Sequence, residues 1–107
     1  MLLGRVLGTV VSTRKDPNME GLKLHVVQVL DVEAKPTKAY VVAVDAVGAD
    51  MGEIVLYATG SSARQTAITQ NKPCDAVVMA IVDTWEVDGR TIYDKTKDEA
   101  RYVSSPG

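Results

Sequence analysis

The residue types that most often carry catalysis or bind metals are scarce in this chain. His25 is its only histidine and Cys74 its only cysteine. One histidine excludes a multi-histidine metal cluster, and one cysteine cannot form an intrachain disulfide. A catalytic cysteine–histidine pair requires a fold that brings these two side chains together. We expect instead a solvated or hydrogen-bonded His25, and we predict no catalytic residues, no metal and no cofactor.

Three acidic residues gather around two glycines and could suggest a calcium loop. Asp45, Asp50 and Glu53 surround Gly48 and Gly52. An EF-hand loop needs alternating oxygen ligands, then glycine, then a glutamate six residues later, and this spacing does not provide them. Our interpretation is that Asp45 hydrogen-bonds loop amides and that the other two carboxylates are solvated.

The segment 60–64 (GSSAR) has the most suggestive local chemistry. Its small residues precede a possible helix start, where backbone N–H groups and the Arg64 side chain could hold an anion. It matches neither the phosphate-binding P-loop nor the nucleophile elbow of hydrolases. The simpler interpretation is a helix cap, with Arg64 in a salt bridge.

The elements that would position these residues are mainly strands. Aliphatic residues dominate the apolar fraction, because aromatic residues are only 5% of the chain and phenylalanine is absent. Valine is β-branched and favours strands. The strand 22–32 is apolar on one face and mixed on the other, where His25 lies. Five β-prone runs are predicted: residues 2–12, 22–32, 39–47, 53–59 and 75–87.

Turn and helix signals complete the predicted fold. Asp88-Gly89 is a two-residue hairpin turn that returns through residues 90–93. Ser61 or Ser62 could cap a short helix that reaches about Ala67. We therefore predict a mostly β fold: a five-stranded OB-like β-barrel with one short helix and a C-terminal hairpin or arm. The chain would be one domain over residues 1–107, with the barrel in about 1–87 and the hairpin and tail in about 88–107.

Charge and hydropathy exclude several classes of partner. The net charge is −2, with acids and bases interspersed, so the basic surface of a nucleic-acid binder is missing. No apolar run approaches the ~20 residues that span a bilayer, and the N-terminal residues do not resemble a secretion signal. We expect a cytoplasmic protein without membrane or nucleic-acid partners. Strand spacing and the segment 60–64 keep one alternative open: a small OB-like module for single-stranded nucleic acid or an anionic metabolite.

Several stretches, taken in order, closely resemble the EutN/CcmL family of bacterial microcompartment vertex proteins. The likeness covers roughly residues 1–84. The ordered set is far more specific than any single motif: GRV at 4–6, GTVV at 8–11, TRK at 13–15, GLK at 21–23, VAVDAVGA at 42–49, GEIVL at 52–56, GSSAR at 60–64 and DAVVMAIVD at 75–83.

The resemblance implies an OB-like barrel that assembles into a cyclic homopentamer and caps the five-fold vertices of a polyhedral shell. The flat facets of such shells are tiled by hexameric proteins, which become expected partners. The resemblance also suggests roles for individual residues. These are Ser61 and Ser62 at the five-fold axis or pore, Asp45, Gly48, Ala49, Gly60 and Arg64 at the subunit interface, and Thr13, Arg14 and Lys15 facing shell hexamers.

One position departs from the family pattern. Gly48-Ala49-Asp50 stands where the pattern often has Gly-Ala-Gly. If this loop approaches a neighbouring subunit, Asp50 adds a charge to that contact.

Overall fold

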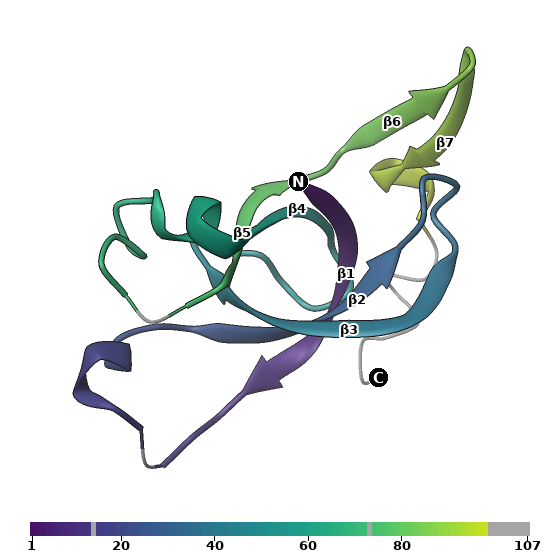
Figure 1. Cartoon of the computed structure of the whole chain (residues 1–107). Helices are drawn as coiled ribbons and strands as arrows, with labels where there is room; N and C mark the ends of the chain where they lie inside the picture. Colours follow the sequence, from purple (N-terminus) through teal and green to yellow (C-terminus); the bar gives the residue numbers. More distant parts are fainter. Residues whose placement is uncertain (14, 73, 99–107) are drawn as a thin grey trace.

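The computed structural model describes residues 1–13, 15–72 and 74–98 (Figure 1). Five strands close into a barrel in the order β1-β2-β3-β5-β4, because β1 pairs with both β2 and β4. All neighbours are antiparallel except β3 and β5, which are parallel. The five-stranded barrel predicted from the strand spacing is therefore confirmed. Its strands are β1 (Leu2–Val10), β2 (Leu24–Leu30), β3 (Pro36–Asp45), β4 (Ile54–Thr59) and β5 (Ala76–Ile81).

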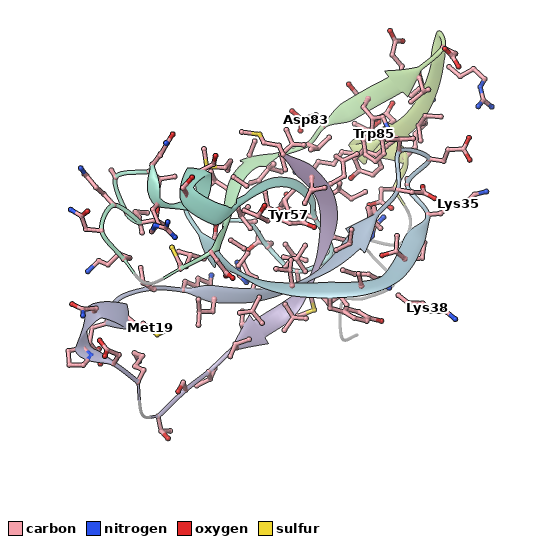
Figure 2. The ribbon with its side chains drawn as sticks, viewed as in Figure 1. Met19, Lys35, Lys38, Tyr57, Asp83 and Trp85 are labelled. Carbon is pink, nitrogen blue, oxygen red and sulfur yellow. The ribbon has the colours of Figure 1, made fainter. Side chains whose placement is uncertain are left out.

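The barrel interior is narrow and is filled by small and β-branched side chains. Tyr57 is the only large aromatic side chain in this cluster (Figure 2). Gly4 makes room for it, since a Cβ at this position would lie 2.3 Å from Val27 Cγ1 and 3.1 Å from Tyr57 Cε1. The buried members of the interior cluster are Val6, Val27, Ala43, Ala49, Val55, Tyr57, Ala76 and Val78.

The face of β2 that points into the barrel is not its apolar face but the face with mixed apolar and polar residues, which carries His25. His25 and Val27 are buried, whereas Leu24 and Val26 on the apolar face are half-buried. Leu24 belongs instead to a second cluster outside the barrel, with Val44, Ala58, Ala63 and Val77. The short helix η2 (Gly60–Arg64) supplies Ala63 to this cluster and so covers one part of the outer wall.

The predicted strand 75–87 is in fact two strands. The chain leaves the barrel after Ile81, and β6 (Thr84–Val87) and β7 (Arg90–Asp94) form a separate hairpin that projects from the barrel (Figure 1). The turn is the predicted Asp88-Gly89, with both residues at positive φ, as a type I′ hairpin requires. Trp85 and Tyr93 of the hairpin pack over a second part of the outer wall, against Leu3, Leu30, Ile54, Leu56 and Val82.

The predicted short helix differs in type and length. It is a 3-10 helix over Gly60–Arg64, and its first residue has φ +66°. Thr59 precedes it without a side-chain cap, so the expected serine cap is wrong. The other helices of the described chain, η1 (Pro17–Met19) and η3 (Lys95–Lys97), are single 3-10 turns. None of these helices is long and apolar enough to cross a membrane.

The tight contact at Gly4 gives a stability test. Gly4→Ala would force a Cβ against Val27 and Tyr57, so we expect a loss of about 1–3 kcal/mol in the free energy of unfolding. Gly8→Ala is the matched control, because a Cβ at Gly8 meets nothing within 4 Å. Urea unfolding followed by circular dichroism measures both changes. Equal stability of the two variants would contradict the packing described here.

Candidate subunit-contact site

The loop 45–53 between β3 and β4 is organised by one buried carboxylate. Asp45 Oδ1 accepts hydrogen bonds from the amides of Val47 (3.0 Å) and Gly48 (2.9 Å). Gly48 has φ +76°, a conformation in which a side chain is strained. The interpretation that Asp45 holds loop amides is confirmed.

The second oxygen of the same carboxylate reaches into the barrel. Asp45 Oδ2 lies 2.9 Å from His25 Nε2, and both side chains are only 2% exposed. Burial by itself raises the pKa of Asp45, but hydrogen bonds from Val47, His25 and the following loop amides outweigh it and lower the pKa below the usual 3.8. An ionised carboxylate can only accept, so Nε2 is the donor in this hydrogen bond. His25 Nδ1 is buried without a hydrogen-bond partner among the described residues.

The other end of the loop contradicts one expectation. Glu53 was predicted to be solvated, yet it is 8% exposed. Its Oε1 accepts from the Asp50 amide (2.7 Å) and its Oε2 from Lys95 Nζ. A carboxylate is stable at this depth because a cation and an amide satisfy it. Asp50 is exposed, as predicted.

Some residues of this loop are buried and hold its conformation, whereas others are exposed to solvent. Asp45 and Ala49, both predicted at the subunit interface, have buried side chains that face the barrel core. Gly48 is exposed, and it lies between two exposed apolar side chains, Val47 and Met51. The sequence did not single out either residue, although exposed apolar side chains in a glycine-bearing loop are typical of a contact surface.

The segment 60–64 presents its serines to solvent. Gly60, Ser61, Ser62 and Arg64 are exposed, while Ala63 is buried against the barrel wall. Arg64 donates to the Cys74 carbonyl (3.2 Å). The expected Arg64 salt bridge is not found among the described residues.

Two of the three residues expected to face shell hexamers, Thr13 and Lys15, lie in a segment that extends away from the barrel. Thr13 and Lys15 are exposed, and Lys15 Nζ lies 3.5 Å from the Ser12 carbonyl. Arg14 lies outside the described residues. The loop connects β1 to η1, at the side of the barrel far from the hairpin (Figure 1).

The structure gives no chemical role to the remaining candidates. His25 bonds Asp45, whereas the Cys74 sulfur lies 4.0 Å from the Ala63 carbonyl. Burial raises the pKa of Cys74, Arg64 opposes this, and Asp75 adds to it, so the thiol is less reactive than a free cysteine. The described residues contain no group of three histidine, cysteine, aspartate or glutamate side chains placed to hold a metal ion.

The described residues leave a third part of the barrel's outer wall uncovered. Val26 lies opposite Val42, and Tyr40 lies opposite the neighbouring Gln28, so these side chains share the outer face of β2 and β3. Val10 opposes Leu24 on the same face. Tyr40 is 60% exposed and Val42 49%. We call Val10, Val26, Tyr40 and Val42 the outer sheet face. An uncovered apolar face of this kind is typical of a contact surface.

Comparison with known proteins places this barrel in a family. The family model described as "Ethanolamine utilisation protein EutN/carboxysome" matches residues 1–83. The chain belongs to the EutN/CcmL family. Among curated EutN/CcmL relatives, the carboxysome shell vertex protein CcmL of Gloeobacter violaceus is 48% identical over 94% of this chain and 100% of its own. The microcompartment shell vertex protein GrpN of Rhodospirillum rubrum is 49% identical over 80% and 97%.

Solved structures of EutN/CcmL proteins share this barrel. CcmL of Gloeobacter violaceus superposes with a TM-score of 0.88 at 47% identity, over 91% of this chain and all of the other. GrpN of Rhodospirillum rubrum, described as a pentameric microcompartment shell protein, has a TM-score of 0.75 at 48% identity, over 81% and 99%. The resemblance found in the sequence is thus confirmed.

The buried Asp45 carboxylate predicts how stability depends on pH. Because folding lowers its pKa, Asp45 adds stability above the unfolded pKa of about 3.8, and this contribution is lost as pH falls through the lower folded pKa. Asp45→Asn should cost about 1–3 kcal/mol at pH 7 and should flatten the loss of stability that the wild-type chain shows as pH falls below the unfolded pKa of Asp45. Urea unfolding at a series of pH values measures this. Asp50→Asn, on an exposed residue of the same loop, is the control, and identical pH profiles for the two variants would contradict the assignment.

Proposed function

We propose that this chain is a structural shell protein whose five-membered rings cap the vertices of a bacterial microcompartment in the cytoplasm. The observation that carries the proposal is agreement over nearly the whole fold with vertex proteins, one of which is described as pentameric. The described residues offer no catalytic constellation that would favour an enzyme. A hexagonal sheet cannot close on itself, and five-fold units at its corners supply the missing curvature.

A five-membered ring requires two different contact surfaces on each subunit. An odd ring is built from head-to-tail contacts, so one surface of a subunit meets another surface of its neighbour. The chain carries two kinds of exposed surface that suit this requirement. One is the outer sheet face, and the other is the loop 45–53 with Val47, Gly48 and Met51. Burial of apolar area across such a contact drives association.

The segment 60–64 suits a position near the ring axis. Ser61 and Ser62 are exposed on a short helix whose Ala63 is anchored in the wall. A ring repeats each side chain five times, so small hydroxyls leave an opening where larger side chains would close it. Gly60 and Arg64, which flank these residues, would lie beside the neighbouring subunit.

The loop with Thr13, Arg14 and Lys15 suits the outer rim of the ring. Thr13 and Lys15 are exposed on a segment that extends from the barrel (Figure 1). In this arrangement it would meet the hexameric proteins of the facets. Charged and hydroxyl side chains of this kind fit the polar rim of an interface.

Co-assembly with hexameric shell proteins tests the vertex role. Shells formed without this chain should be open or elongated in electron micrographs, and adding the wild-type chain should give closed polyhedra. Unchanged shells in its presence would contradict the proposal.

Variants at Gly48 connect the same assay to the loop. Gly48→Glu places a charge on the presented loop and should prevent closure. Gly48→Ala carries the same backbone strain at φ +76° but little bulk, so it should still close shells. If shells close with both variants, the loop 45–53 is not part of the contact between subunits.

A further inference from the structure

The loop 45–53 is fixed at its second end by residues from beyond the family match. The family model ends at residue 83, whereas Lys95 and Asp98 follow the hairpin. From the contacts below, we infer that residues 95–98 form a clamp that holds the loop 45–53 ready to meet a neighbouring subunit. This inference rests on the proposed ring.

The first contact of the clamp is an ion pair with a part of the loop. Lys95 Nζ bonds Glu53 Oε2, and the other oxygen of Glu53 accepts the Asp50 amide. The side chains of the pair are 23% and 11% exposed, so water screens their attraction only in part. The ammonium group therefore orients the carboxylate that holds the turn at Asp50.

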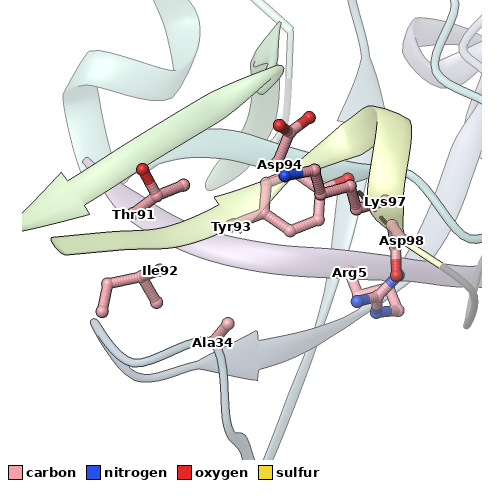
Figure 3. A pocket seen from close by; sticks show the side chains of 8 residues that line it. All are labelled: Arg5, Ala34, Thr91, Ile92, Tyr93, Asp94, Lys97 and Asp98. Atoms are coloured by element: carbon pink, nitrogen blue, oxygen red, sulfur yellow. Dashed lines mark hydrogen bonds and ion pairs between the residues drawn. The ribbon is translucent and has the colours of Figure 1, made fainter.

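The second contact comes from the other side of the same turn. Arg5 Nη1 donates to both the Gly52 carbonyl (2.8 Å) and Asp98 Oδ2 (2.9 Å). Asp98 also accepts from the Tyr93 hydroxyl (3.3 Å). Figure 3 shows Arg5 and Asp98 joined beside Tyr93, in the lining of an open pocket of about 450 Å³. Asp98 thus fixes the arginine that holds Gly52.

The clamp itself is held in place by the hairpin. The Lys95 amide donates to the Asp83 carbonyl (2.8 Å), which ties the clamp to the end of the barrel. Asp94 Oδ1 accepts from both the amide and the hydroxyl of Thr96. Trp85 Nε1 donates to the Val32 carbonyl (2.8 Å), and its ring lies 5.2 Å from that of Tyr93. These bonds hold the hairpin and the clamp against the barrel. The clamp can therefore fix the position of the loop 45–53.

The clamp matters for assembly because it holds the second end of the loop 45–53. The residues between the two held ends are exposed and can meet a neighbouring subunit. Asp45 fixes the first end from within the barrel, and Glu53 fixes the second. Val47 and Met51 are exposed between these points, 39% and 50% respectively. A loop ordered before association loses less conformational entropy on binding, which strengthens the contact. Loss of the clamp should therefore weaken the ring while the barrel stays folded.

Lys95→Met tests this inference, with Lys97→Met as a matched control. Both substitutions remove one positive charge from the same 3-10 turn, but Lys97 is exposed and makes no hydrogen bond or ion pair with the loop among the described residues. Hydrogen exchange of the Asp50 amide should become about tenfold faster in Lys95→Met and stay unchanged in Lys97→Met. The subunit concentration at which rings dissociate, measured by size exclusion with light scattering, should rise about tenfold in Lys95→Met alone. Lys95→Arg should restore both properties.

Two further measurements distinguish an effect of the clamp from a general loss of stability, and a failure of the clamp inference from a failure of the proposed ring. Thr37→Val removes a hydrogen bond to the Val29 carbonyl and serves as a destabilised variant with an intact clamp. If it weakens rings as much as Lys95→Met, the clamp inference is wrong. Stable wild-type rings that Lys95→Met leaves unchanged would also overturn it, and the proposed function would stand. If the wild-type chain forms no ring, the proposed function fails and the clamp loses its role.

Discussion

The width of a five-stranded barrel is the constraint on which the rest of this structure depends. The interior cluster holds one large apolar ring, Tyr57, among alanine and valine side chains, and Gly4 leaves no room for a side chain of its own. The buried His25–Asp45 pair lies beside this cluster. Apolar residues are 46% of the chain, which is more than so narrow a core can bury. The remaining apolar side chains lie on the outer wall of the barrel. Other segments of the chain cover some of them, and the rest are exposed to solvent. Among the described residues, the helix η2 and the C-terminal hairpin cover two parts of the outer wall, and the outer sheet face stays exposed.

The covering elements explain the order of the chain after the fourth strand. The 3-10 helix Gly60–Arg64 covers the wall at one end, and the C-terminal hairpin covers the wall beside β1 and β4. The uncovered outer sheet face and the loop 45–53 remain, and a ring of identical subunits can bury both. The apolar area that the barrel leaves exposed is the area that the proposed ring would bury.

Strand positions could be predicted from the sequence because β-branched runs and turn signals are local features. The Asp88-Gly89 turn and the amide contacts of Asp45 followed from backbone chemistry alone. The inward face of β2 could not be predicted in this way, because His25 points inward only through a partner twenty residues later. Burial of Glu53 depends on Lys95, forty-two residues away. The division of residues 75–87 into two strands has the same origin, since the hairpin leaves the barrel to cover the outer wall.

The site was predicted unevenly for a similar reason. The family motifs indicated the loop and the segment 60–64, but they did not separate residues that support the loop from those it presents. Asp45 and Ala49 are buried, whereas Val47 and Met51 are exposed. Three-dimensional packing decides that difference. The class of protein, by contrast, is evident from the ordered motifs of the sequence alone.

Native mass spectrometry of the purified chain tests the central claim most directly. The subunit is 11.5 kDa, so a ring of five should appear at five times that mass, 57.5 kDa. We expect this species to dominate at micromolar concentration. A folded monomer, or a ring of another size, would contradict it.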